Sequence, residues 1–348
     1  MKRVFARVGI VFLCVVVLSS SVIWITGNDH LFKAVASTYL RGKTGPGIDD
    51  MHLFSYRSVP ATQPQPWPLS NQYNTTELTK NELDGLMPYA PVALLVIKHD
   101  SIVFEKYWEN YAQDSYSNSF SVAKTIVGLA TGVALKKGLI SDIDDRVSDY
   151  LPEFNQMRPS EVTIRHLLTM TSGINFNEHY GDPLGFMAKA YYGDDLIGKT
   201  LVFSSENEPG TLWHYLGGNT LLLAMIINKV SGVPLSVFVA ENIWSKIGAE
   251  QDAHWSLDED KGFEKAFCCY YSNARDFARI GKLYLDSGRW NGEQIVPEWF
   301  VLESIQPVET STETIPHYGY HLWLLNGEKE HIYYARGILG QYILCIPD

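Results

Sequence analysis

The feature of this sequence that most restricts its fold is a lysine inside an otherwise apolar run. Residues 122–134, VAKTIVGLATGVA, are almost all apolar or small, the pattern of a helix that is covered on most sides. Lys124 lies inside this run, three residues after Ser121. Because burying an ammonium group is costly, the segment predicts a core helix whose lysine has a chemical reason to be inside.

The Ser-x-x-Lys spacing places both side chains on one face of a helix, one turn apart. If that turn opens into a cleft, Ser121 lies at the positive end of the helix dipole and becomes a candidate nucleophile. Burial lowers the pKa of a lysine, so Lys124 could accept the serine proton. Such a pair also arises by chance, and Lys124 could instead extend to the surface. The spacing alone leaves both interpretations open.

Composition excludes several classes of protein. The chain has 348 residues, 46% of them hydrophobic, which is enough for a large core and two packed domains. With 39 acidic and 28 basic residues it lacks the electrostatic footprint of a nucleic-acid-binding protein. The four cysteines show neither zinc spacing nor a disulfide framework. No metal site is predicted, and we interpret His317 and His321 as surface histidines.

The N-terminus predicts a membrane segment. Three basic residues within the first seven precede an uncharged run, residues 8–27, which is about as long as a transmembrane helix. The basic flank predicts that the N-terminus stays in the cytoplasm and the rest is exported. A cleaved signal peptide is the rival interpretation, but the Ala34-Val35-Ala36 site lies too far from the apolar run. We therefore expect residues 1–27 to form an uncleaved anchor, with a signal segment as the alternative.

The next region is expected to lead away from the membrane. Residues 28–80, rich in Gly, Pro and polar residues between 43 and 73, are predicted to be an extended arm or linker. Residues 92–108, VALLVIKHDSIVFEKYW, contain two β-rich runs around a polar tip. They predict a β-hairpin directly before the Ser121 helix.

The remaining sequence predicts a helical block inside a strand-bearing scaffold. Residues 121–253 are mostly helical in pattern, with amphipathic runs such as NTLLLAMIINKVSG. After residue 254 a helix, NARDFARIGKLYLDSG, precedes the strand-like runs HYGYHLWLL, HIYYARG and QYILCIP. We expect one domain over 81–348, with a helical subdomain at about 121–253 and a mainly antiparallel sheet from roughly 49–120 and 254–348.

Four motifs together carry a family resemblance. They are the S-x-x-K pair, VTIRHLLTMTSGI, EPGTLWHY and ARDFARIG, and they occur in this order from Ser121 onward. The chain resembles, from about Asp49 to its last residue, the serine hydrolases related to class C β-lactamases and penicillin-binding proteins. It is most similar to the esterase and 6-aminohexanoate-oligomer hydrolase branch. The resemblance implies an α/β (α+β) fold, an antiparallel sheet flanked by helices with an all-helical subdomain, and a cleft with Ser121 at its floor.

The resemblance also implies roles for individual residues. Ser121 would be the acylated nucleophile, Lys124 its proton partner, and Tyr215 the phenol that shuttles a proton to the leaving group. The third motif corresponds to ARGILGQ, where Gly337 would let the backbone approach the substrate. The N–H groups of Ser121 and Ile338 would form the oxyanion hole.

Two further positions are candidates for substrate binding. Tyr180 corresponds to a loop tyrosine that contacts the substrate amide in the oligomer-hydrolase branch, and the neighbouring Glu178 and Asp182 read equally well as solvated loop charges. Class C β-lactamases carry Tyr-x-Asn, whereas here the asparagine follows only at Asn219. The Lys-Thr-Gly of the third motif is Ala-Arg-Gly here, with Arg336 at its centre. Both departures disfavour a β-lactamase or D-alanyl peptidase.

The expected function is therefore a serine hydrolase that cleaves an ester or small amide through an acyl-enzyme. No cofactor or metal is required, the partner is a small-molecule substrate, and the sequence leaves the oligomeric state open. With its anchor the protein is expected at a bacterial inner membrane, with the catalytic domain exported. A silent membrane-anchored binding or sensor domain is the alternative from another class. An α/β-hydrolase is disfavoured because no G-x-S-x-G occurs.

The end of the chain departs from the family pattern. The sequence stops at CIPD, directly after the last predicted strand, whereas this family usually continues with another strand and a C-terminal helix. We therefore expect the C-terminal end to be truncated.

Overall fold

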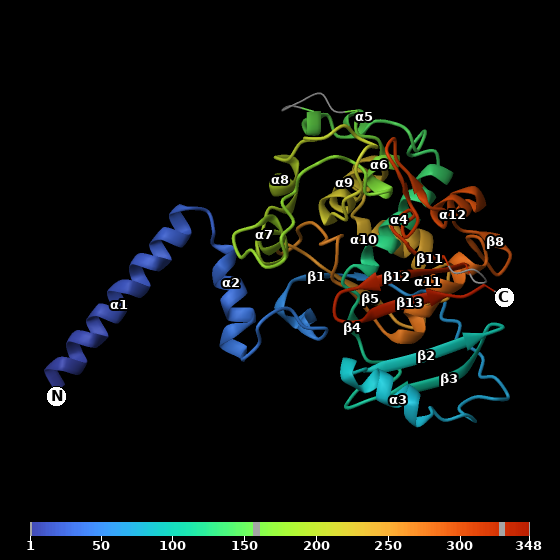
Figure 1. Ribbon diagram of the computed structural model, residues 1–348, viewed down its shortest axis with the longest axis horizontal. Helices are drawn as coiled ribbons and strands as arrows, with labels where there is room; N and C mark the ends of the chain where they lie inside the picture. Colours follow the sequence, from blue (N-terminus) through green and yellow to red (C-terminus); the bar gives the residue numbers. More distant parts are fainter. Residues whose placement is uncertain (1, 156–160, 327–330, 348) are drawn as a thin grey trace.

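The helix that carries the lysine is the centre of the fold. The computed structural model describes residues 2–155, 161–326 and 331–347. In it α4 (Val122–Lys136) begins directly after Ser121, and its residues from Val122 to Ala134 are all buried. α4 contacts α9 (Gly217–Ser231) and two strands, β12 (His331–Gly337) and β13 (Gln341–Cys345), so it lies between the helical block and a sheet (Figure 1). The prediction of a core helix at this position is confirmed.

The C-terminal strands form one face of the body. β11 (Trp323–Asn326), β12 (His331–Gly337) and β13 (Gln341–Cys345) form an antiparallel sheet in that order. α11 (Ala274–Leu285) packs against both β13 and β2. β2 (Ala93–Lys98) and β3 (Ser101–Tyr107) are the predicted hairpin. Its two tip residues, His99 and Asp100, have φ of 48° and 59°, as a two-residue hairpin turn requires.

A second sheet joins distant segments of the chain. Its strands lie in the order β1 (Tyr56–Val59), β5 (Ala253–Ser256), β6 (Tyr270–Ser272) and β4 (Ser117–Asn118). β4 ends three residues before Ser121, and Ser119 N–H donates to the carbonyl of Tyr270 at 2.8 Å. This sheet therefore fixes the chain that enters α4.

The arm predicted over residues 28–80 is not simply extended. It contains α2 (His30–Ser37), η1 (Tyr39–Arg41), η2 (Asp50–Leu53) and strand β1. The side chains of Val59 and Trp67 are buried in the core. Sequence pattern missed this packing because its apolar residues are separated by Pro and polar residues and show no period.

The helical block covers the other side of α4. Its further elements are α5 (Val147–Tyr150), η4 (Pro152–Asn155), α6 (Ile164–Leu168), α7 (Phe186–Tyr192), α8 (Leu196–Leu201), α10 (Leu235–Val239) and the π-helical η5 (Ala240–Trp244). Short elements complete the fold: α3 (Lys80–Leu86), η3 (Met87–Tyr89), β7 (Arg289–Trp290), β8 (Glu293–Gln294), α12 (Glu298–Ser304), β9 (Val308–Glu309) and β10 (Thr314–Ile315). The predicted organisation, antiparallel strands flanked by helices with a helical block between them, is confirmed.

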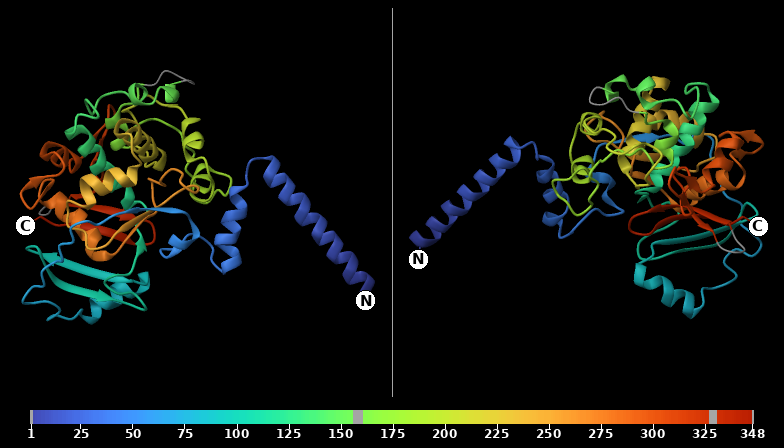
Figure 2. Two further views of the ribbon diagram at one scale, coloured as in Figure 1. Left: turned by 180° about the vertical axis from the view of Figure 1, so that it is seen from behind. Right: turned by 45° about the horizontal axis from the view of Figure 1, so that its top comes forward.

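The N-terminal helix stands apart from the rest. α1 (Lys2–Ile25) extends away from the body (Figure 1, Figure 2). Its stretch Arg7–Ile25 has a mean hydropathy of 2.7, and none of it is buried against the protein. The helix is long and apolar enough to cross a membrane, and a signal sequence would have the same properties.

Candidate active site

Ser121 occupies a sharp turn at the entrance to α4. The residue before it, Phe120, has φ of 44°, a conformation that bulky side chains rarely adopt. Asn118 Oδ1 accepts the Phe120 N–H at 2.9 Å and helps to hold this turn. Ser121 itself is the N-cap of the helix, so its hydroxyl stands at the positive end of the helix dipole. Unfavourable backbone geometry of this kind is common at functional sites.

Lys124 does not extend to the surface. Its side chain is 1% exposed, and its Nζ donates to Ser121 Oγ at 3.1 Å and to the Phe267 carbonyl at 2.8 Å. Burial lowers the pKa of this ammonium to about 8, and the negative charge of Glu178 opposes the shift. A substantial neutral fraction therefore exists slightly above neutral pH. The geometry and the pKa both allow Lys124 to take a proton from the serine.

Tyr215 completes the cluster. The Lys124 Nζ lies 5.0 Å from the centroid of the Tyr215 ring, and the ring packs against Tyr318 and Trp323. Burial raises the pKa of the phenol, although the nearby Ser121 hydroxyl and Arg336 act in the opposite direction. The Tyr215 side chain is therefore a neutral phenol at ordinary pH. The structure thus brings together the three side chains that the motifs singled out.

Glu178 is a member of this cluster that the sequence did not single out. Its carboxylate accepts the N–H groups of Gly217 at 2.7 Å and Gly218 at 2.8 Å, the first two residues of α9. Burial raises its pKa, while these hydrogen bonds and Lys124 lower it. The interpretation as a solvated loop charge is wrong. The signal was the glycine pair that begins two residues after Tyr215, because a helix start leaves N–H groups that need an acceptor.

Replacing Glu178 by glutamine should change the pH dependence of the enzyme. The Glu178 charge raises the pKa of Lys124, so its removal lowers that pKa further. We expect neutral Lys124 to accept the serine proton, so kcat/KM should rise with pH through this pKa. We expect the midpoint of that rise in Glu178→Gln to move to lower pH, by a few tenths to about one pH unit. Initial rates of ester hydrolysis between pH 6 and 10 measure it.

Asp182 supplies the matched control for this experiment. It lies in the same loop, but its Oδ1 accepts the Leu184 N–H, and the charge does not act on Lys124. Asp182→Asn should leave the midpoint where it is in the unchanged protein. A midpoint that stays fixed in Glu178→Gln, or moves upward, would contradict the coupling.

The end of β12 is pressed against the chain that leads into Ser121. A Cβ on Gly337 would lie 2.4 Å from the Ser119 carbonyl oxygen, so any other residue would push the strand away. The sequence predicts that Gly337 allows approach to the substrate, whereas the observed close contact is with the protein backbone. Ile338 follows directly and is 54% exposed. Its N–H belongs to a strand end held beside Ser121, and its oxyanion role stays a prediction.

The two substrate-binding candidates differ in accessibility. Asn219 is fully buried in the first turn of α9, where its Oδ1 accepts the Ser172 hydroxyl at 2.7 Å and its Nδ2 contacts Met170 Sδ at 3.4 Å. The expectation that Asn219 binds substrate is therefore corrected: it joins α9 to the segment before it. Tyr180 is 60% exposed on the loop that also carries Glu178, so its side chain is accessible to a ligand.

His321 is a second correction. Its side chain is 2% exposed, and Nδ1–H donates to the Lys124 carbonyl at 3.0 Å. Burial lowers its pKa to about 3, so the imidazole is neutral. Thr125 Oγ1 also donates to the His321 carbonyl, at 2.8 Å. His321 therefore fixes the first turn of α4, whereas His317 is exposed as expected.

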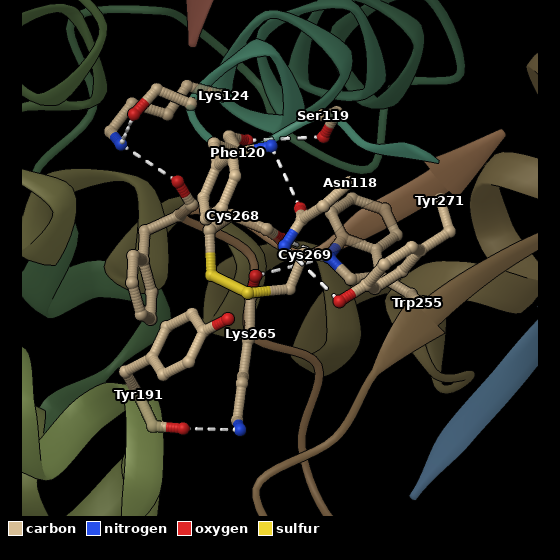
Figure 3. The surroundings of a disulfide bond; sticks show 12 residues. Asn118, Ser119, Phe120, Lys124, Tyr191, Trp255, Lys265, Cys268, Cys269 and Tyr271 are labelled. Carbon is tan, nitrogen blue, oxygen red and sulfur yellow. Dashed lines mark hydrogen bonds between the residues drawn. A yellow bond between two sulfur atoms is a disulfide. The ribbon is translucent and has the colours of Figure 1, made fainter. Parts of the chain in front are cut away.

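A disulfide between adjacent residues lies beside the cluster. Cys268 and Cys269 are bonded to each other, which the sequence did not predict, and both are buried (Figure 3). Trp255 Nε1 donates to the Cys268 carbonyl at 2.9 Å. The preceding residue, Phe267, supplies the carbonyl that accepts from Lys124. The disulfide therefore directly follows the residue whose carbonyl accepts a hydrogen bond from Lys124.

Comparison with known proteins places this geometry in a family. The family profile described as "Beta-lactamase" matches residues 83–348. A 6-aminohexanoate-dimer hydrolase from Paenarthrobacter ureafaciens is 27% identical over 275 residues, covering 73% of this chain and 69% of that protein. The structure named "Putative 6-aminohexanoate-dimer hydrolase from Bacillus anthracis" superposes with a TM-score of 0.71 and 21% identity, covering 84% of this chain and 82% of that one. EstCE1, a hydrolase with promiscuous acyltransferase activity, gives a TM-score of 0.54 and 15% identity, covering 73% and 87%.

Proposed function

This chain belongs to the β-lactamase family and is a serine hydrolase, and on that premise we propose that it cleaves an ester or a small amide through an acyl-enzyme on Ser121. The observation that carries the proposal is the buried Lys124, whose ammonium lies 3.1 Å from the Ser121 hydroxyl. A purely structural lysine would not need a serine partner at the start of a helix. A sensor domain without catalytic activity would likewise have no need to bury the charge of Lys124.

In the proposed mechanism neutral Lys124 removes the Ser121 proton as Oγ attacks the carbonyl carbon. The oxyanion that forms is stabilised by the N–H groups of Ser121 and Ile338. Tyr215, a neutral phenol because burial raises its pKa, donates a proton to the leaving oxygen or nitrogen. Water then attacks the acyl-enzyme, gives its proton along the same path in reverse, and releases the acid.

The altered motifs support an ester or linear amide over a β-lactam. Gly217 occupies the position of the asparagine in Tyr-x-Asn, and the side chain of the next asparagine, Asn219, is buried. The lysine of the third motif is replaced by Ala335, and the next residue, Arg336, has its guanidinium over the Trp323 ring at 5.7 Å. The names of two relatives, a 6-aminohexanoate-dimer hydrolase and a hydrolase with promiscuous acyltransferase activity, also support an ester or linear amide as the substrate.

The proposed location is a bacterial inner membrane, with α1 as the anchor and the catalytic domain exported. The apolar stretch Arg7–Ile25 supports an anchor. The Cys268–Cys269 disulfide supports export, because disulfides persist mainly in oxidising compartments.

A substrate panel tests the proposed function. We expect the full-length protein to hydrolyse p-nitrophenyl butyrate, and a linear dimer of 6-aminohexanoate at a lower rate, with a chromogenic cephalosporin at least about 100-fold slower than the butyrate. Faster turnover of the cephalosporin, or stable labelling by a fluorescent penicillin, would favour a β-lactamase or D-alanyl peptidase. No turnover of any substrate by the folded protein would favour the sensor domain.

A further inference from the structure

The short helix after α1 has its polar side inside and its apolar side outside. α2 buries His30 against the body, whereas Phe32 and Val35 are 44% and 42% exposed. Tyr39 and Leu40, which follow the helix, are 68% and 79% exposed. A helix on a water-facing surface shows the opposite arrangement. Neighbouring apolar side chains left uncovered mark a surface that meets a membrane or a partner.

The distance along the chain favours the membrane. α1 ends at Ile25 and α2 begins at His30, and five residue steps span at most about 17 Å even when fully extended. With α1 in the bilayer, α2 therefore lies at its surface. An apolar outer side is stable there, because it enters the boundary between headgroups and acyl chains.

α2 is attached to the loop that carries two residues of the candidate site. His30 Nε2–H donates to the Pro183 carbonyl at 2.8 Å, and α2 packs along α7 (Figure 1, Figure 2). Pro183 belongs to the same loop as Glu178 and Tyr180. The contact therefore keeps this edge of the site close to the membrane surface.

An apolar groove opens in the same region. It has a volume of about 560 Å³; its apolar part is lined by Leu184, Phe186, Val202 and Phe203, and its polar part by Asn177, Lys189, Asp195 and Lys199. Leu184 and Val202 are 51% and 60% exposed at its rim. Asn177 precedes Glu178, whose carboxylate reaches the start of α9 beside Tyr215. The groove and the cluster therefore share the segment that contains Asn177 and Glu178, and the volume of the groove is that of a small-molecule site.

Resting on the proposed function, we propose that this groove faces the membrane and holds the hydrocarbon chain of a long-chain acyl ester or amide. The amphiphilic substrate enters from the bilayer surface, its chain lies between Leu184 and Val202, and its carbonyl reaches Ser121. Water cleaves the acyl bond and supplies the oxygen of the released carboxylate, while the alcohol or amine leaves with a proton. Each methylene that the groove buries increases kcat/KM by up to about fourfold.

The test compares acyl-chain lengths in the full-length protein. The chain is reconstituted in phosphatidylcholine nanodiscs, and kcat/KM is measured for p-nitrophenyl butyrate and p-nitrophenyl decanoate. We expect the decanoate to exceed the butyrate at least about 10-fold. Val202→Asp should reduce this ratio to within about threefold, because a charged side chain in the groove disfavours the hydrocarbon chain. Leu302→Asp is the matched control, because Leu302 is 46% exposed on α12, far from α7 and α8 in Figure 1, and should keep the full ratio.

The outcomes separate this inference from the proposed function. Butyrate hydrolysis without a preference for the decanoate would overturn the membrane-facing groove and leave the hydrolase intact. A preference that survives both Val202→Asp and Leu184→Asp would assign the groove to another occupant, such as a peptide or a second copy of the chain, and would also overturn the inference. Absence of any ester hydrolysis by the reconstituted protein would refute the proposed function itself.

Discussion

Ser121→Ala should lower kcat/KM for p-nitrophenyl butyrate by at least about 10⁴-fold, because no other atom in the site can form the acyl-enzyme. The serine hydroxyl is the group that Lys124 contacts at 3.1 Å, and its removal leaves the rest of the cluster in place. The free energy of unfolding should change little, because alanine is tolerated at this N-cap, where the serine side chain caps no backbone N–H. Steady-state rates and thermal unfolding of the purified variant measure both effects.

Ser119→Ala is the matched control for this variant. Ser119 is 1% exposed, lies two residues earlier and donates its hydroxyl to the Phe120 carbonyl at 3.2 Å. Its hydroxyl does not contact Lys124, so activity should stay within a few-fold of the unchanged protein. If Ser121→Ala retains more than about a tenth of the activity, the nucleophile is another residue.

Lys124→Met should lower kcat/KM by about 10³-fold or more, because methionine fills a similar space but accepts no proton. The rise of activity with pH, centred near the lysine pKa of about 8, should disappear with it. The free energy of unfolding should not fall together with the activity. Burial disfavours the charged lysine, so replacing it by an apolar side chain should leave the free energy of unfolding unchanged or raise it.

Lys265→Met separates a catalytic lysine from a buried one. Lys265 is also fully buried, with its Nζ donating to the Tyr191 carbonyl at 2.5 Å, and burial lowers its pKa in the same way. It makes no contact with Ser121, so Lys265→Met should keep its kcat/KM within a few-fold and retain the pH profile. Equal losses in both variants would show that Lys124 acts only through folding.

The parts of the fold that the sequence predicted are those with local patterns. α4 followed from an apolar run with no polar face, and the β2–β3 hairpin from two β-rich runs around a polar tip. The segment 28–80 lacked such a pattern, because β1 pairs with β5, almost 200 residues later in the chain, and no local signal marks a partner so distant.

For single residues of the site as well, the sequence predicts what a local motif marks and misses what depends on tertiary packing. The Ser-x-x-Lys spacing marks Ser121 and Lys124 in the sequence, and the family resemblance implies their roles and that of Tyr215. The sequence leaves open whether Glu178 is a solvated charge, since whether a loop carboxylate meets a helix start depends on tertiary packing alone. Asn219 was misassigned because counting from Tyr215 ignores where α9 begins. The helix starts at Gly217, and its first turn directs this side chain toward Ser172.

The central claim, an activated serine at position 121, is tested most directly by a covalent probe. Full-length protein in detergent is treated with a fluorophosphonate, and intact mass and peptide mapping locate the adduct. The account predicts a single adduct on Ser121, absent in Ser121→Ala and formed much more slowly in Lys124→Met, with Lys265→Met labelled at the normal rate. An adduct on another residue, or no adduct on demonstrably folded protein, would contradict it.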